Sequence, residues 1–357
     1  MTQTSKPKTL VITSSSMARG AEIEAVQLVA NLRLNGVPAM VQSLTRGDSP
    51  TIGSLVPLGK WRHSPTTLGR LRWAARRADV VVAYGSRALP ACALALTGSS
   101  TPFIYRSIGD PAAWIRSDLH RRATAAQYRR AAAVAVLWPA AGDAVQHLFG
   151  VERARVHEVP NARDPSEFTP PSLAERSAAR QRLGLADTRV VVFVGSLRPE
   201  KQIQLAVRTI AQAPGWTLVV AGDGPDRRSA EDLSARIAPG RVLFLGHQRD
   251  IASVFRIADA VLITSRTEGM PGVAIEAALS GVPVVATPVG ALTSMPGVTL
   301  AAPHDSALAR ALDRADRATG ARAEARAAYS WDAVTRRWVR LLQAVAGSSA
   351  GSCLPDE

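Results

Sequence analysis

The sequence predicts an α/β protein made of two doubly wound domains. Its 357 residues are 46% hydrophobic and 20% charged, a composition that can bury a large core and excludes an intrinsically disordered chain. This length exceeds one comfortable core, which favours two domains. Short apolar runs alternate with helical patterns in two successive series, and strands that alternate with helices form parallel sheets. We therefore expect two parallel-sheet domains, one after the other along the chain.

The strands of the two domains are predicted from short apolar runs rich in β-branched residues. The first series lies at residues 9–13, 38–44, 79–83, 103–105, 134–137 and 156–159. The second series lies at residues 190–195, 217–221, 242–246, 259–263 and 283–287.

Turn signals between the two series predict the domain boundaries. Residues 160–171 contain four prolines and an Asn-Ala-Arg-Asp turn, which is typical of a linker. We therefore place the first domain at residues 1–165 and the second at 166–328. A helix is expected at residues 329–345, and the Gly/Ser-rich residues 346–357 are expected to form a disordered tail.

The net charge of +14 is concentrated in the first domain. Residues 1–165 contain 21 Lys and Arg against 10 Asp and Glu. The positive residues cluster at 60–63, 70–77 and 116–130, where Arg116, His120 and Arg130 would share a helical face. Such clusters coat a solvated surface or bind an anionic membrane or an acidic acceptor, and nucleic acid is not expected.

Targeting and cysteine signals point to the cytoplasm. The longest apolar runs have about ten residues, against the roughly 20 that a membrane-spanning helix needs. Residues 1–8 are polar and lead directly into a strand, without the apolar region of a signal peptide. Cys92 and Cys353 provide neither a disulfide framework nor a metal-binding spacing. We expect a cytoplasmic protein, and the basic clusters leave open a peripheral contact with the inner face of the membrane.

The stretch from Glu268 to Glu276 is the most informative part of the sequence. It follows a predicted buried strand and crosses a Gly/Pro turn into a helix that starts near Ala274. Loops at the carboxyl ends of parallel strands are where open α/β sheets bind ligands. A helix amino terminus at such a place favours an anion such as a pyrophosphate. The stretch therefore predicts a site for a sugar and a phosphate.

Five motifs occur in order around this stretch, at residues 195–201 (GSLRPEK), 220–225 (VAGDGP), 244–246 (FLG), 265–276 and 281–287 (GVPVVAT). Together they resemble the carboxyl-terminal half of a family 4 retaining glycosyltransferase with the GT-B fold. The first half is similar through residues 20–22, 79–84 and 159–161 with Phe168, and Tyr329-Ser330-Trp331 resembles the segment that returns to the first domain. The resemblance implies two Rossmann-like domains whose parallel sheets face a central cleft, with the donor on the second domain.

The resemblance assigns different roles to the two glutamates. Glu276 would accept hydrogen bonds from the ribose of a nucleotide-sugar donor. Glu268 would bind hydroxyls of the transferred sugar and stabilise positive charge at its anomeric carbon. The alternative for either residue is a salt bridge or a charge near a helix amino terminus.

Arg198 and Lys201 follow the first strand of the second domain and are the cations expected to stabilise the leaving diphosphate, together with the backbone N–H groups of Gly272 and Val273. Both cations could instead be surface charges. Further donor contacts are expected from Gly20, Gly246, Gly269, Met270 and Pro271. Gly246 could equally be an ordinary strand-end glycine.

Two positions depart from the family pattern. Ser196 stands where the family commonly has an arginine, so Arg198 would have to replace it. The first domain has no histidine at residues 106–111, where family members often carry one, so Asp110 would orient the acceptor or the donor sugar unless it only forms a turn. No Asp-x-Asp pair occurs, which favours a metal-independent reaction without a cofactor.

The function expected from these residues is the transfer of a hexose, with retention, from a UDP- or GDP-sugar. The acceptor would be a saccharide, a lipid-linked molecule or a small molecule bound by the basic first domain. Two alternatives stay open: a GT-B nucleotide-sugar epimerase, which needs no acceptor, and a noncatalytic relative that only binds a nucleotide sugar.

Overall fold

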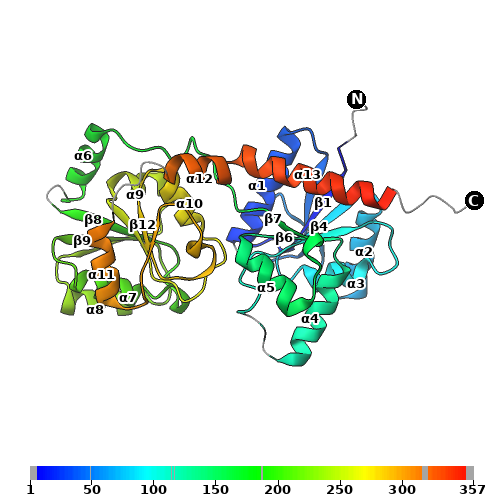
Figure 1. Ribbon diagram of the computed structural model, residues 1–357, viewed down its shortest axis with the longest axis horizontal. Coiled ribbons are helices and arrows are strands. Elements are labelled where there is room, and N and C mark those ends of the chain that lie inside the picture. The colour runs from blue at the N-terminus through cyan, green and yellow to red at the C-terminus, as the bar shows by residue number, and fades with distance from the viewer. Residues whose placement is uncertain are drawn as a thin grey trace, which may run out of the picture. The chain divides into compact units, whose positions relative to one another are not determined.

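The structure is a computed structural model that describes residues 6–48, 50–113, 115, 117–185, 188–315 and 321–350. The chain forms two units (Figure 1). One comprises Met1–Asn161 and Trp331–Glu357, and the other comprises Ala162–Ser330. Residues 162–165, which the sequence assigned to the first domain, are part of the second unit, because Arg163 donates its backbone N–H to the carbonyl of Tyr329 at 2.9 Å.

The first unit is built on a seven-stranded parallel sheet with the order β3-β2-β1-β4-β5-β6-β7. Its strands are β1 (Thr9–Ser15), β2 (Ala39–Thr45), β3 (Val56–Gly59), β4 (Val80–Tyr84), β5 (Phe103–Arg106), β6 (Ala133–Val136) and β7 (Val156–Glu158). The chain adds strands outward from β1 in one direction and then returns to place β4 on the other side of β1. Ligands bind at such a switch point, outside the carboxyl ends of β1 and β4.

Helices cover the first sheet on both faces. They are α1 (Gly20–Leu34), α2 (Pro65–Ala75), α3 (Leu89–Ala95), α4 (Asp118–Arg130), α5 (Pro139–Phe149) and α13 (Trp331–Ala350). Helices α1 and α13 contact one another, whereas α2 to α5 contact each other in succession (Figure 1). Local signals explain the ends: Ser64 caps α2 ahead of Pro65, and Gly150 ends α5 in the left-handed conformation with φ of 62°.

The second unit is built on a six-stranded parallel sheet with the order β10-β9-β8-β11-β12-β13. Its strands are β8 (Arg189–Val194), β9 (Trp216–Ala221), β10 (Val242–Gly246), β11 (Ala260–Ile263), β12 (Val284–Ala286) and β13 (Val298–Leu300). The helices are α6 (Leu173–Arg182), α7 (Ile203–Ala211), α8 (Arg227–Ile237), α9 (Ile251–Ile257), α10 (Gly272–Leu279), α11 (Asp305–Arg314) and α12 (Ala321–Tyr329). Here the switch point lies between β8 and β11, so the loops that follow these two strands meet at one edge of the sheet.

The prediction of two doubly wound parallel sheets is confirmed, with two kinds of error in the elements. Strands β3 and β13 were missed; each forms an edge of its sheet, is only three or four residues long and is partly exposed. Residues 346–350 were expected in a disordered tail, but they form the last turn of α13. The rest of that expected tail, and Arg116 of the basic cluster at 116–130, lie outside the described residues.

Candidate functional site

The loop between β8 and α7 presents the two cations predicted for the diphosphate. It is anchored by Leu197, which is fully buried and donates its N–H to the Asp223 carbonyl at 2.9 Å. The Arg198 side chain that follows is exposed and makes no ion pair with any described residue. Lys201 ends a short 3₁₀ turn, and Gln202 after it has a left-handed φ of 50°. The loop thus holds Arg198 at the switch-point edge, where an incoming anion can reach it.

Lys201 and Glu268 form an ion pair across the switch point. The Lys201 Nζ lies 2.5 Å from Oε1 of Glu268, and the Glu268 side chain is only 10% exposed. Ser265 donates its hydroxyl to the same oxygen at 2.6 Å. The buried Thr264 hydroxyl donates to the Lys201 carbonyl at 2.8 Å, which ties the two loops together. The structure therefore brings together two residues that the sequence placed in the same site from separate motifs.

Glu276 is paired with a residue that the sequence did not single out. Arg163 donates from Nε to Oε1 of Glu276 at 2.6 Å, and the two side chains are 21% and 14% exposed. A Cβ added to Gly272 would lie 1.8 Å from Nη2 of Arg163. The guanidinium therefore lies against the amino end of α10, and a larger residue at position 272 would require the Arg163 side chain to move. Arg163 was interpreted as part of a linker turn, and its positive charge was the only signal that could have drawn attention to it.

The amino end of α10 is suited to an anion. Its N-cap residue is Pro271, which provides no side-chain cap, so the first backbone N–H groups, including those of Gly272 and Val273, have no capping side chain. These groups and the positive end of the helix dipole attract a phosphate. The Met270 side chain is buried, so a ligand contact at that position would involve its backbone.

Close backbone contacts fix the surrounding loops. A Cβ at Gly222 would lie 1.8 Å from the carbonyl oxygen of Gly195, and one at Gly290 would lie 2.3 Å from that of Glu268. The carbonyl of Gly269 accepts a hydrogen bond from Ala291 at 2.8 Å. Gly246 has φ of 70°, and its carbonyl accepts from Gly222 at 2.8 Å. These contacts give Gly222, Gly246 and Gly290 structural reasons for being glycine.

In the first unit, the sequence singled out Gly20 and Asp110. A Cβ at Gly20 would have no atom within 4 Å, so a ligand has space to approach the backbone there. The Asp110 Oδ1 accepts from the Ala112 N–H at 2.9 Å, the geometry of the turn that the sequence allowed as an alternative. In the same stretch the buried Arg106 donates to the carbonyls of Val159 and Pro160.

Several cations of the basic cluster at 70–77 have structural partners. Arg72 donates to the carbonyls of Ala95 and Thr97, at the carboxyl end of α3. The Arg77 guanidinium lies 3.4 Å from the ring centre of Trp73. This cluster is therefore at least partly a structural surface.

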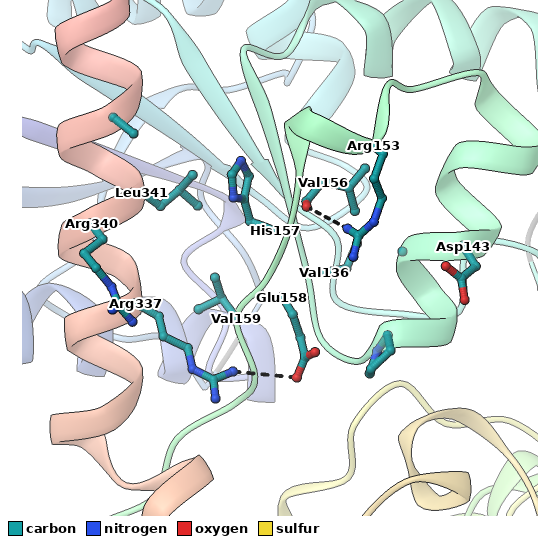
Figure 2. Close-up of a pocket in the computed structure, with 13 residues that line it drawn as sticks. Val136, Asp143, Arg153, Val156, His157, Glu158, Val159, Arg337, Arg340 and Leu341 are labelled. Carbon is teal, nitrogen blue, oxygen red and sulfur yellow. Dashed lines mark hydrogen bonds and ion pairs between the residues drawn. The ribbon is translucent and has the colours of Figure 1, made fainter.

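A cavity of about 540 Å³ lies in the first unit between β7, α5 and α13 (Figure 2). Its lining mixes charges: Arg153, Arg337 and Arg340 face the same space as Asp143 and Glu158. The Arg337 Nη1 lies 3.6 Å from Oε1 of Glu158. Burial, and then the charge of Arg153, lower the pKa of His157 in this cavity.

None of the helices in the described part of the chain combines the length and hydropathy that crossing a bilayer requires. Within the described ranges, no three His, Cys, Asp or Glu side chains are grouped so as to hold a metal ion.

Part of the chain is similar to proteins of known family. Residues 188–315 match the family model described as glycosyl transferases group 1. D-inositol 3-phosphate glycosyltransferases of Mycobacterium tuberculosis and Mycobacterium bovis are 40% identical to this chain over 155 residues. The match takes in 41% of this chain and 32% of theirs, so the chain spans about a third of the length of these relatives.

Solved structures resemble the whole chain. HepE (Alr3699) of Anabaena in complex with UDP has a TM-score of 0.84 at 22% identity, covering 94% of this chain and 100% of that one. Sucrose-phosphate synthase of Thermosynechococcus elongatus has a TM-score of 0.78 at 20% identity, covering 95% and 99%. At these identities the likeness concerns the fold alone. Residues 188–315 are therefore similar to the group 1 glycosyl transferases, and the chain as a whole has the GT-B fold of two parallel-sheet domains.

Proposed function

We propose that the chain is a retaining hexosyltransferase that takes its sugar from a UDP-sugar and passes it to an acceptor bound by the first unit. The observation that carries the proposal is the contact between Lys201 and Glu268 across the switch point of the second sheet, within the segment that matches the family model. Two anion-binding elements, Arg198 and the amino end of α10, flank this contact along the chain. A donor that carries both a sugar and a diphosphate fits such a combination.

We propose UDP rather than GDP as the nucleotide of the donor, because a protein of similar fold has been solved with UDP bound. HepE has been solved in complex with UDP and with UDP-glucose. In this chain, Glu276 would hold the ribose. Its Oε1 accepts from Arg163, and a carboxylate has enough lone pairs for its other oxygen to accept from a ribose hydroxyl.

The leaving diphosphate would be stabilised by fixed positive groups. An ammonium has three N–H donors, and Lys201 uses one of them on Glu268, so the others can bind phosphate oxygens. Arg198 adds a guanidinium that can bind phosphate through two N–H groups at once. Negative charge grows on the diphosphate as the glycosidic bond breaks, so these groups stabilise the transition state more than the ground state.

Transfer with retention would follow a front-face course. The bond between the anomeric carbon and the diphosphate oxygen breaks, and the acceptor oxygen bonds to the same face of the sugar. The acceptor's proton passes to the departing phosphate oxygen. Glu268, held by Lys201 and Ser265, would bind sugar hydroxyls and stabilise the positive charge at the anomeric carbon.

The reaction is tested by measuring UDP release from UDP-glucose and other UDP-sugars by the full chain, with and without a panel of acceptors. We expect acceptor-dependent release, and a Glu268→Gln variant should lose at least about a hundredfold in rate while it still binds UDP. Glu231→Gln, on α8 and paired with Arg227 by a side chain that is 43% exposed, serves as the matched control. Unchanged turnover in Glu268→Gln would overturn the role of that residue, and interconversion of the donor sugar without any acceptor would identify an epimerase.

A further inference from the structure

Three arginines of the first unit lie in loops at the carboxyl edge of its sheet. Arg19 follows β1, Arg62 follows β3 and Arg87 follows β4. Arg19 and Arg87 line a cavity of about 190 Å³ with Glu22. Arg62 lines a second cavity of about 510 Å³, together with Arg46, Lys60 and His63.

The charges of the two cavities act on one another. Burial lowers the pKa of Arg62, and the nearby positive charges of Arg87 and Arg19 lower it further. Glu22 opposes this effect, but its Oε1 already accepts the Ser14 hydroxyl at 2.8 Å. Two positive charges and one negative charge thus act on Arg62, and the local balance of charge is positive.

None of these three arginines forms an ion pair with a described residue, in contrast to arginines elsewhere in the chain. In the second unit, for example, Arg176 and Arg180 share the carboxylate of Asp259. Like charges that lie together without a partner repel one another, and an anion would relieve the repulsion.

The backbone holds the three arginines in fixed loops. Before Arg19, the Ala18 N–H donates to the Pro50 carbonyl at 2.9 Å, and the Ile52 N–H donates to the Ser16 carbonyl at 2.8 Å. Next to Arg62, the Thr67 hydroxyl donates to the Trp61 carbonyl at 2.7 Å.

Arg87 follows a turn that only glycine adopts easily. Gly85 has φ of 85° and donates its N–H to the Arg106 carbonyl at 3.0 Å. Loops fixed in this way preorganise the three side chains for a ligand.

We propose that this edge binds a phosphate monoester carried by the acceptor, with Arg19, Arg62 and Arg87 as its ligands. Guanidinium groups bind phosphate oxygens in pairs of parallel hydrogen bonds, and a doubly charged phosphate matches three cations better than a neutral sugar does. Glu22 is placed beside it to accept a hydrogen bond from an acceptor hydroxyl. This assignment rests on the proposed function, because it names the acceptor of that reaction.

The experiment titrates inorganic phosphate, glucose 6-phosphate and glucose into the full chain with the donor site saturated by UDP, and follows thermal stabilisation. Phosphate and glucose 6-phosphate should stabilise the protein further, whereas glucose should have a much smaller effect. An Arg62→Gln/Arg87→Gln double variant should weaken phosphate binding by about tenfold or more for each guanidinium removed. Arg122→Gln, on the exposed face of α4, is the matched control and should behave like the wild type.

The titrations distinguish a site for the phosphate of the acceptor from a site for the diphosphate of the donor. If the double variant instead weakens UDP, and phosphate has no effect once UDP is bound, the cluster serves the donor diphosphate and the acceptor assignment is overturned. A phosphate shift that the double variant leaves intact overturns it as well, as does the absence of any shift. The double variant relieves repulsion, so its melting temperature without ligand should not fall, which shows that it folds.

If the proposed function is wrong, UDP will not raise the melting temperature of the wild type, and this result distinguishes it from a failure of the acceptor site alone. In that case the phosphate titration is repeated without UDP. A response that depends on Arg62 and Arg87 supports the anion site independently of the donor, and no such response overturns it.

Discussion

Arg163 and Glu276 are 113 positions apart in the sequence, and their side chains meet with Nε 2.6 Å from Oε1. The arginine comes from the first residues of the second unit and lies against Gly272, at the amino end of α10. The carboxylate proposed to hold the ribose is therefore positioned by a cation that also lies where a diphosphate would bind. This arrangement links the nucleoside and phosphate parts of the donor site.

Replacing Glu276 by glutamine should weaken binding of the nucleoside part of the donor more than binding of the phosphate part. The amide keeps the shape but loses the negative charge that pairs with the Arg163 guanidinium. We expect UDP affinity to fall by about 10- to 100-fold, as hydrogen bonds to charged groups contribute about 1.5–3 kcal/mol. Pyrophosphate affinity should fall much less. Calorimetric titration of both ligands measures the difference, and an equal loss for the two would remove Glu276 from the nucleoside site.

Lys201 and Glu268 should be coupled in stability as well as in catalysis. Lys201→Met leaves a carboxylate that is only 10% exposed without its cation, and we expect a loss of about 1–3 kcal/mol in the free energy of unfolding. Adding Glu268→Gln should recover part of this loss, because the unpaired charge is gone. Urea unfolding of the two single variants and the double variant gives the coupling; strictly additive effects would contradict the ion pair.

Substitution of two glycines by alanine should have opposite effects on the stability of the fold. At Gly222 the new Cβ would collide with the Gly195 carbonyl, so Gly222→Ala should lower stability by at least about 2 kcal/mol. At Gly20, the first residue of α1, the Cβ meets open space, so Gly20→Ala should be neutral or stabilising by up to about 1 kcal/mol.

Gly20→Ala nevertheless bears on the site. If a ligand approaches that backbone closely, the KM for a substrate rises although the melting temperature does not fall. Unchanged kinetics in a stable Gly20→Ala variant would take Gly20 out of the binding surface.

His157 should make the stability of the first unit depend on pH. Burial and Arg153 lower its pKa in the folded chain, so the unfolded chain binds the proton more readily. The folded state then keeps its full stability above the ordinary histidine pKa of about 6.5 and loses stability as the pH falls below it. His157→Gln should flatten the stability profile between about pH 5 and 7. The exposed His247→Gln is the control, and an equally steep profile in His157→Gln would contradict the assignment.

The strands that bury most of their surface could be predicted from the sequence. Strands such as β8, with four consecutive valine or phenylalanine positions buried, carry a strong apolar signal. Strand β3 was missed because it is a four-residue edge strand with Pro57 in it and two exposed positions. An edge strand that faces solvent lacks the apolar run by which buried strands are recognised.

The site was predictable where its residues follow strands. Lys201 and Glu268 come after β8 and β11, which are neighbours at the switch point, so their meeting follows from the topology. Arg163 lies in an irregular segment with no periodicity, and nothing in its sequence context indicates Glu276 as its partner. The gathering of Arg19, Arg62 and Arg87 was hidden for the same reason, since each is a single residue in a different loop.

Hydrogen–deuterium exchange with saturating UDP tests most directly whether a UDP-sugar binds at the switch point of the second sheet. Bound UDP should slow the exchange of backbone amides in residues 195–203 and 264–276, and the Arg198→Gln/Glu276→Gln variant should lose that protection. Protection confined to other segments, or no protection at UDP concentrations that saturate related enzymes, would contradict it.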